Sequence, residues 1–332
     1  MVAPRLDPSK PRYGLSKAVA YHTPLTFNPG MDKTAIEGRY ELFFMICGDP
    51  TDLLRTTALR DWRAKCKTAV CLIDELWVRQ MSAYQNFLKI LDNFDVVMLY
   101  YSQSVDPLNK RIGRKCSYMP PGVDTLRFCP YPQPDRVIDV YSIGRRSEKT
   151  HKILVKMAAE QNFFYLHDTI AANQILDPTQ HRVLFANVAK RSRYFIVNPG
   201  LIDRPDIRGD QMEIGNRYFE AAASGMFMLG ERPDNGEFGR LFDWHDALIH
   251  VPYDSDEIEA TIHDFDQDPE RQETLRRTSV SQSLIRHDWV HRWEAVLNSV
   301  GLEPMPQLAQ RKEHLSTVAR TVVQDTRAVS NL

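Results

Sequence analysis

Basic side chains crowd one predicted junction between a strand and a helix, in the segment "YSIGRRSEKTHK" (141–152). Gly144 allows the backbone to approach a ligand closely, and cations follow it: Arg145, Arg146, Lys149 and Lys152. The dipole of a helix is positive at its N terminus, where acidic residues are normally favoured. Cations at this place therefore predict a bound anion, and a phosphate or diphosphate is the natural candidate. The alternative is a turn whose charges are solvated.

A second candidate site lies in "GNRYFEAAASGMFML" (215–229), on a predicted helix that opens with Asn216. Arg217 and Glu220 stand one turn apart on this helix. The carboxylate of Glu220 can accept two hydrogen bonds from vicinal hydroxyls such as those of a ribose, and Arg217 can pair with Glu220 or reach a phosphate. The alternative is a surface salt bridge worth roughly a few tenths of a kcal/mol. The small residues that follow let the helix lie close to a sheet, and Gly225 can end it in the left-handed conformation.

Carboxylates in the first half of the chain follow two predicted strands, in "CGDP" (47–50) and "LIDELW" (72–77). Asp74 or Glu75 is a candidate general base for an acceptor hydroxyl, if a neighbour tunes its pKa. Two lesser candidates are Asp49 and His22. Polar residues that follow the third predicted strand are candidates for lining an acceptor site: Tyr101, Ser102 and Gln103. The alternative for each carboxylate is a helix cap or a solvated loop.

The elements that must position these residues alternate along the first part of the chain. Residues 1–38 hold several prolines and little periodicity, which predicts mostly irregular structure. The predicted strands are 40–48, 68–74, 95–102 and 116–122, and the predicted helices are 51–66 and 78–94. This alternation predicts βαβ units with a parallel sheet. The strands are continuously apolar, which indicates a sheet covered on both faces.

A proline-rich segment, "PPGVDTLRFCPYPQPDR" (120–136), interrupts the alternation, which then restarts. The later predicted strands are 137–144, 163–167, 193–200 and 247–253, and the later helices are 147–161, 179–192 and 235–242, with the helix and strand of 215–229 among them. Two long helices are predicted near 255–265 and 268–300. Residues 303–332 are polar, with weak helical signal and no core pattern.

The pattern predicts an α/β protein with two doubly wound domains that face each other across a cleft. We expect an amino-terminal domain at 1–119, a linker at 120–136, a second domain at 137–300 and a polar tail at 301–332. Ligands of open α/β sheets bind outside the carboxyl ends of the strands, so the cleft is the expected active site. We interpret "HDWVHRW" (287–293) as an aromatic anchor for the last helix rather than a site.

Composition narrows the function classes. The chain has 332 residues with 42 basic and 43 acidic side chains, a balance that argues against a dedicated nucleic-acid binder. Its five cysteines form no CxxC pair, so we expect neither a zinc site nor a disulfide framework. The segment "MVAPRLDPSKPRYGLSK" lacks the apolar core of a signal peptide, and no apolar run reaches the length of a spanning helix. We therefore expect a cytoplasmic protein.

Several segments also carry a resemblance to a known family. They are "NRYFEAAASGMFMLGERPDNGEFGRLF", "ALIHVPYDSDEIEATIHDFDQDPERQETLR" and "HDWVHRW". They resemble the carboxyl half of GT-B-fold glycosyltransferases, most closely the family 1-like or spore-maturation-protein-like group with its "RxFEaxacG" signature. "MPPGVDTLRF" is similar to the "PNGVDxxxF" connection between the two domains of these enzymes. The resemblance covers roughly residues 117–300.

The resemblance implies roles for the candidate residues. The glutamate that matches Glu220 would hold the nucleotide ribose, and basic residues that match Arg145 and Lys149 would hold the pyrophosphate. Retaining members carry two glutamates eight positions apart, and the first of them touches the donor sugar. Met212 stands at that position here, and Glu213 is one residue out of register. Retaining and inverting chemistry therefore both stay open.

The function implied is transfer of a sugar from a nucleoside-diphosphate sugar to a hydroxyl acceptor, as in polysaccharide biosynthesis. We expect no metal and no other cofactor, because such enzymes resemble one another in meeting the leaving diphosphate with a helix dipole and cations. The acceptor would be a glycan, a lipid-linked molecule or another hydroxyl compound, with peripheral membrane contact possible in principle and no nucleic acid. The alternatives are a non-catalytic GT-B scaffold that binds a nucleotide or a partner protein and, less favoured, a GT-B epimerase or phosphorylase.

Overall fold

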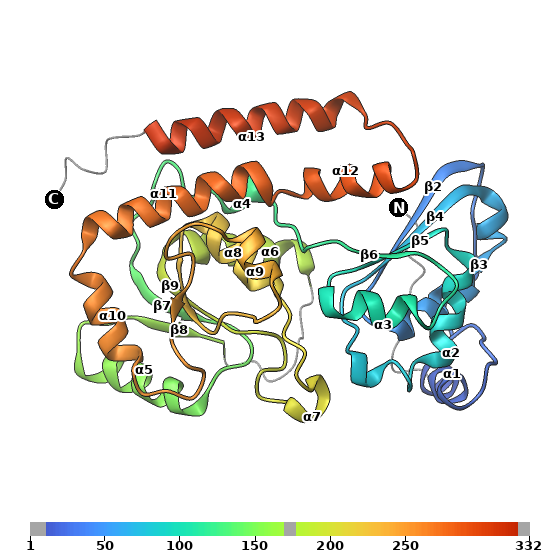
Figure 1. Cartoon of the computed structure of the whole chain (residues 1–332), viewed down its shortest axis with the longest axis horizontal. Coiled ribbons are helices and arrows are strands. Elements are labelled where there is room, and N and C mark those ends of the chain that lie inside the picture. Colours follow the sequence, from blue (N-terminus) through green and yellow to red (C-terminus); the bar gives the residue numbers. More distant parts are fainter. Residues whose placement is uncertain (1–10, 169–176, 325–332) are drawn as a thin grey trace. The chain divides into compact units, whose positions relative to one another are not determined.

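The computed structural model describes residues 11–168 and 177–324, whose path is drawn in Figure 1. The chain divides into two compact units. The first consists of the chain up to Pro120 together with Pro205–Gln211 and Ala295–Glu303, and the second of Pro121–Arg204, Met212–Glu294 and the chain from Pro304 onward. The placement of two domains across a cleft stays a prediction.

Within its described residues, the first unit holds a four-stranded parallel sheet in the order β2-β4-β5-β6. Its strands are β2 (Tyr40–Cys47), β4 (Cys66–Ile73), β5 (Val96–Leu99) and β6 (Cys116–Tyr118). Cys47 pairs in register with Ile73, and Ile73 with Leu99. The carboxyl ends of these three strands are therefore level, so the loops that follow them share one edge of the sheet. The predicted strands of this half are confirmed in their places.

The connections between these strands differ from the prediction. The two α-helices expected at 51–66 and 78–94 are wrong: the chain forms 3-10 segments, one α-helical turn and one extra short strand there. These are η1 (Pro50–Ala58), β3 (Leu59–Arg60), η2 (Trp62–Lys65), η3 (Val78–Gln80), α2 (Gln85–Leu88) and η4 (Lys89–Asn93), with β3 paired to β1 (Thr34–Ala35). In η1 the hydroxyls of Thr56 and Thr57 donate to backbone carbonyls three residues earlier, which competes with regular helix bonding.

Other short helices complete the first unit. The prediction of mostly irregular structure in residues 1–38 is wrong for Pro11–His22, which form α1; residues 1–10 lie outside the described residues. Ala20 of α1 packs with Leu54 and Phe87. The remaining short elements are η5 (Ser102–Ser104), α3 (Val105–Asn109) and α7 (Pro205–Arg208).

The described part of the second unit holds a five-stranded parallel sheet in the order β11-β10-β9-β7-β8. Its strands are β7 (Ile138–Ser142), β8 (Tyr165–His167), β9 (Ser192–Val197), β10 (Phe227–Gly230) and β11 (Ile249–His250). The order moves outward from β7 to β8, returns to β9 on the other side of β7 and then continues away. This reversal between β7 and β9 is the mark of a doubly wound sheet. In the first unit the strand order follows the chain instead.

Helices cover both faces of this second sheet, as the doubly wound prediction requires. They are α5 (Glu148–Glu160), α6 (Pro178–Lys190), α8 (Asn216–Ser224), α9 (Glu237–Leu241) and α10 (Ile258–Asp266). Tyr141 and Phe195 pack on one face with Phe185 of α6 and Phe219 of α8. On the other face, core residues of the sheet and of α5 and α10 pack together: Val140, Tyr194, Phe227, Leu154 and Ile258. Figure 1 shows α5 and α10 on the opposite side of the sheet from α6 and α8.

The last helices also differ from the prediction. The helix expected at 268–300 is two helices, α11 (Pro269–Arg286) and α12 (Trp289–Ser299). The polar end of the chain was expected to lack a core pattern, yet α13 (Pro306–Gln324) lies beside α11 (Figure 1). Leu315, Ala319 and Val322 are buried there with Val280 and Leu284 of α11. An apolar stripe at spacings of four and three residues is enough to dock a helix that is otherwise polar.

The segment that separates α11 from α12 explains the break. Asp288 is fully buried and accepts hydrogen bonds from the backbone and hydroxyl of Thr125, which begins α4 (Thr125–Phe128), and from the backbone of Val290. Arg311 of α13 pairs with both of its oxygens, at 2.7 and 2.8 Å. The expected anchor "HDWVHRW" therefore holds the chain through the buried carboxylate of Asp288 as well as through ring contacts of His287 with Phe219 and Phe242. No helix in the described ranges is long and apolar enough to cross a membrane.

Candidate functional site

The reversal of strand order in the second unit marks where a ligand is expected. In doubly wound sheets the loops after the two strands at the reversal diverge, and ligands bind outside the carboxyl ends of those strands. Here the strands are β7 and β9, and the loop after β7 holds Gly144 and Arg145. Arg145 pairs with Asp203 in the loop after β9, at 2.9 Å. This ion pair joins the two loops at the reversal.

The predicted basic turn lies at this edge, but its cations are paired with carboxylates. Arg146 pairs with Asp168 at 3.0 Å, and Lys149 with Asp256 at 3.4 Å. Lys152 pairs with Glu148 at 2.8 Å. The backbone of Gly144, at φ +84°, also donates to Asp168. Sequence reasoning found the cations because they are adjacent, and it missed most of their partners because these come from distant loops.

Helix α8 positions the second candidate cluster. Its small residues Ala221, Ala222 and Ala223 are buried, as expected for a helix that lies close to a sheet. Gly225 ends the helix at φ +67°, which confirms the predicted left-handed cap. The carbonyl of Ser224 accepts from Arg136 at 2.8 Å, and cations at this end complement the helix dipole. Asn216, the first residue of α8, is exposed.

Glu220 accepts from two arginines rather than one. Its side chain is 3% exposed, and Oε2 accepts from Nη1 of Arg217 at 2.8 Å, as the sequence suggested. Oε1 accepts from Nη1 of Arg182, which lies on α6 and which sequence reasoning missed. The pairing follows from the packing of α6 against α8 and leaves no local signal in the sequence. We call Arg182, Arg217 and Glu220 the triad.

Aromatic rings support both arginines of the triad. The guanidinium of Arg217 lies 4.8 Å from the ring centre of Phe185 on α6. That of Arg182 lies 5.3 Å from the centre of Phe128 and 5.9 Å from that of Phe185. Cation–π contacts of this kind hold the guanidinium groups against the core.

Tyr141 of β7 connects the triad to the basic turn. Burial raises the pKa of its phenol to about 12; Arg217 lowers that pKa, and the charges of Asp168 and Glu220 raise it further. Tyr141 therefore lies within electrostatic reach of both clusters. The triad and the turn share the carboxyl edge of one sheet.

The loops after β9, β10 and β11 are tied together at the same edge. A Cβ on Gly230 would lie 1.8 Å from the carbonyl oxygen of Val197, so only glycine fits there. The backbone of Glu231 donates to Asn198, and its carboxylate accepts from the backbone of Tyr253 at 2.9 Å. The edge is therefore a rigid platform, which sequence reasoning did not identify.

Glu213, the residue beside the expected sugar-contacting position, is buried at 1% exposure. Asn235 donates to the carbonyl of Met212 at 2.9 Å and so holds this segment to the loop after β10. The one-residue shift seen in the sequence thus places the Glu213 carboxylate inside the fold.

In the first unit, Asp74 follows the central strand β4. Burial raises the pKa of its carboxyl to about 6, and the charge of Glu75 adds to that rise. The carboxylate of Asp74 makes no hydrogen bond to any described residue. Glu75 is exposed and accepts from the indole of Trp77 at 2.6 Å. The raised pKa makes Asp74 a candidate for proton exchange near neutral pH.

The other candidates of the first unit either cap or end a helix or follow the third strand of the sheet. Asp49 caps η1 by accepting from Thr51 at 2.6 Å, and His22 is exposed at the end of α1. Tyr101 packs edge-on against Trp77, with ring centres 4.8 Å apart. Ser102 and Gln103 follow it in η5, at the same edge of the sheet.

Gln211, which sequence reasoning missed, ties the loops of this edge together. Its amide accepts from the backbone of Val78 and donates to the hydroxyl of Ser104, both at 2.9 Å. Gln211 belongs to Pro205–Gln211, a segment that lies between β9 and α8 in sequence yet packs in the first unit.

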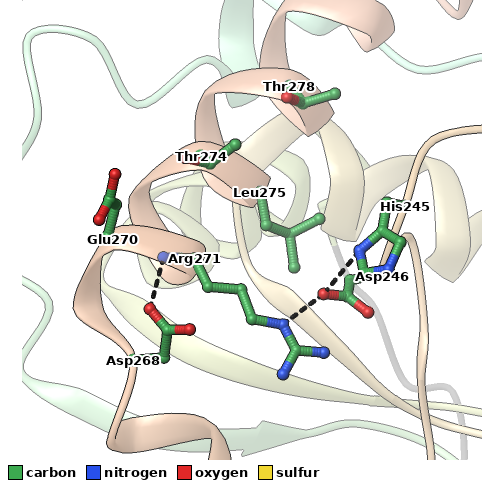
Figure 2. Close-up of a pocket in the computed structure, with 8 residues that line it drawn as sticks. All are labelled: His245, Asp246, Asp268, Glu270, Arg271, Thr274, Leu275 and Thr278. Atoms are coloured by element: carbon green, nitrogen blue, oxygen red, sulfur yellow. Dashed lines mark hydrogen bonds and ion pairs between the residues drawn. The ribbon is translucent and has the colours of Figure 1, made fainter.

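Two cavities lie away from these edges. Figure 2 shows one of about 340 Å³ where the loop before β11 meets the start of α11. Its lining residues are His245, Asp246, Asp268, Glu270, Arg271, Thr274, Leu275 and Thr278. The other, of about 290 Å³, lies between the proline-rich segment and the end of α6. Both lie beside segments that enter strands, at the amino edge of the sheet. Among the described residues, no group of three histidine, cysteine, aspartate or glutamate side chains is arranged to hold a metal ion.

Comparison with known proteins adds to this geometry. Residues 159–298 match the family model described as "Glycosyl transferase-like". Anabaena Alr3699/HepE in complex with UDP is similar to the chain at a TM-score of 0.50 and 12% identity, over 90% of this chain and 84% of that one. The same protein in complex with UDP and glucose has a TM-score of 0.49 and 14% identity, over 79% of this chain and 78% of that one. In complex with UDP-glucose it has a TM-score of 0.48 and 11% identity, over 85% of this chain and 79% of that one. No curated protein matches the sequence.

Proposed function

The chain carries a glycosyl transferase-like domain of the GT-B type, as its sequence predicted, and from this premise we propose that it moves a sugar from a nucleoside-diphosphate sugar to a hydroxyl acceptor. The observation that carries the proposal is the family match itself. The matched residues 159–298 include α6, α8 and the loop after β9, and so include the triad at the reversal of the sheet.

We propose that the donor binds at the carboxyl edge of the second sheet. The residues proposed to bind it are Gly144, Arg145, Arg146, Lys149, Asn216, Arg217 and Glu220. Glu220 would meet the ribose hydroxyls: each of its carboxylate oxygens has two lone pairs and accepts one hydrogen bond from an arginine, so one lone pair remains on each oxygen. UDP is the first nucleotide to test, because the similar HepE was solved with UDP.

The cations of the basic turn would act on the leaving group. Negative charge builds on the diphosphate as its bond to the sugar breaks, and fixed cations stabilise that charge without reorganising. Their aspartate partners keep them oriented before the donor arrives. A nucleotide-sugar donor also fits the cytoplasmic location expected from the sequence.

We propose that Asp74 is the general base toward the acceptor, with Glu75 as the second candidate. The acceptor hydroxyl would pass its proton to the carboxylate as its oxygen bonds to the anomeric carbon. The bond from that carbon to the diphosphate oxygen breaks, and the diphosphate leaves with the electron pair. A carboxyl with a pKa of about 6 is mostly ionised at pH 7 and still basic enough to help. The acceptor would be a glycan, a lipid-linked molecule or another hydroxyl compound, reached in the lipid-linked case through peripheral membrane contact.

A thermal-shift screen followed by a turnover assay tests the proposal. A nucleotide that binds only the folded state raises the melting temperature, so UDP, GDP, ADP and TDP identify the base. The matching sugar nucleotides are then incubated with the protein, and release of the diphosphate is measured. Binding with release supports a transferase. Binding without release or transfer to any of a panel of acceptors would favour the non-catalytic scaffold, and no binding would contradict the proposal.

A further inference from the structure

We infer that Arg182 and Arg217 are ligands of the donor's diphosphate and that Glu220 positions both of them for it. Arg182 was not identified as a site residue from the sequence; the structure brings it to Glu220. The inference rests on the proposed function, because it names the part of the donor that this cluster meets.

The triad has an excess of positive charge. Two guanidinium groups share one carboxylate, whereas each arginine and lysine of the turn at 145–152 has a carboxylate partner. Each guanidinium has five N–H donors. Arg182 and Arg217 each use one of them on Glu220 and make no other hydrogen bond to the residues that the structure describes. Donors and charge therefore remain for an anion.

Burial decides which members of the triad face the ligand. The side chain of Glu220 is 3% exposed, while those of Arg182 and Arg217 are 37% and 36% exposed. The carboxylate is thus shielded from solvent, whereas the two guanidinium groups are partly exposed. A molecule that approaches from solvent meets the arginines first.

The arginines are also held in place before a ligand binds. Glu220 fixes one edge of each guanidinium, and the rings of Phe128 and Phe185 support their faces. A fixed fork loses less conformational freedom when it forms hydrogen bonds than a flexible side chain does. The loss of Glu220 would free both forks at once.

The position of the triad favours the same ligand as the sheet topology does. Helix α6 runs into β9 and α8 follows β9, so both helices begin at the carboxyl edge beside the reversal of strand order. Arg182 is the fifth residue of α6 and Arg217 the second of α8. Planar guanidinium groups match the oxygens of phosphates two at a time. Two of them suit the two phosphates of a nucleoside diphosphate.

Calorimetric titrations with UDP, uridine and inorganic pyrophosphate test the inference on the full chain. Arg182→Ala and Arg217→Ala should each weaken UDP and pyrophosphate about tenfold to a hundredfold, the range for one charged hydrogen-bonding partner. Their affinity for uridine should change less than about twofold. Glu220→Gln should weaken UDP and pyrophosphate as well, because the forks lose their anchor.

Arg271→Ala is the matched control. Arg271 also pairs with a carboxylate, that of Asp246, and also lies over an aromatic ring, 5.0 Å from the centre of Phe265. It lines the cavity of Figure 2 at the other edge of the sheet, so its loss should leave all three affinities unchanged. Arg182→Lys keeps the charge without the fork and should lose part of the affinity. If Arg182→Ala fails to fold, the UDP and pyrophosphate affinities of Arg182→Lys test the inference instead.

The outcomes separate the inference from the proposed function. Parent-like binding of UDP and pyrophosphate by the Arg182 variants would overturn the inference while the transferase stands. Pyrophosphate binding that depends on Arg182, in a protein that binds no nucleotide, would support the inference and remove the proposed donor. Equal losses for uridine and UDP would place the arginines on the nucleoside and overturn the diphosphate assignment. A parent that binds none of the three compounds and no other nucleotide would overturn both.

Discussion

Glu220 in the second unit and Asp74 in the first each lie at the carboxyl edge of a parallel sheet, but their surroundings differ. Glu220 is buried and accepts from two arginines, so its charge is compensated where it stands. Asp74 is half-buried, its carboxylate accepts no hydrogen bond from a described residue, and its pKa rises to about 6. A compensated carboxylate can hold cations in place, whereas an uncompensated one with a raised pKa can exchange protons. We propose that carboxylates serve these two kinds of chemistry in the two units.

The largest expected effect comes from removing Asp74, the proposed proton acceptor. Asp74→Asn should lower the rate of sugar transfer by about 10²- to 10⁴-fold, the usual contribution of a general base, and leave nucleotide affinity unchanged. In the parent, the rate should rise with pH through about 6, because the base acts only when ionised, and this rise should vanish in the variant. Initial rates across pH 5–8 measure both effects.

Glu75→Gln is the comparison for that experiment. Glu75 is exposed and already accepts from Trp77, so its loss should change the rate by less than about threefold. A large loss in Glu75→Gln with near-parent rates in Asp74→Asn would exchange their roles. Near-parent rates in both would place the base elsewhere or indicate retaining chemistry without one.

Glu220→Ala should have the next largest effect, on donor binding rather than on the fold. The two arginines lose their common anchor, and any ribose hydroxyl loses its acceptor, for a cost of about 2–4 kcal/mol in nucleotide affinity. Isothermal titration with UDP measures the change, and the melting temperature serves as the control. Equal affinity in the variant and the parent would remove Glu220 from the donor site.

A third test sharpens the comparison through stability. A half-buried aspartate with a raised pKa is more stable protonated, so it costs stability as pH rises from about 4 through about 6. Asp74→Asn should therefore raise the free energy of unfolding by about 1–3 kcal/mol at pH 7.5 and by almost nothing at pH 4. Urea unfolding at the two pH values measures it. A variant that loses stability at pH 7.5 would show that the Asp74 carboxylate has a partner.

The smallest effects should come from the basic turn. Arg145→Ala and Lys149→Ala should each lower kcat about threefold to tenfold, and raise KM less, because these cations act mainly as charge develops in the transition state. The effect is modest because Asp203 and Asp256 already compensate much of their charge and about half of each basic side chain is exposed. Steady-state kinetics with a varied donor separate the two constants. A change confined to KM would assign these residues to ground-state binding.

Many features of the fold were predictable because they depend on residues that are close together in the sequence. Continuous apolar runs between turn residues predicted the strands of both sheets. The Arg217–Glu220 pair was also predictable, because a helix brings residues three apart together. The Gly225 cap was predictable because left-handed backbone favours glycine. These features depend on local geometry alone.

Other features were decided only by the tertiary structure, since packing brings together residues that are distant in the chain. Arg182 meets Glu220 because α6 packs beside α8, and Asp203 meets Arg145 because strand order reverses between β7 and β9. The docking of α13 likewise depends on the surface that α11 offers to the apolar stripe of Leu315, Ala319 and Val322. Whether a carboxylate is compensated is therefore a property of the folded neighbourhood, where the residue type sets only the charge to be compensated.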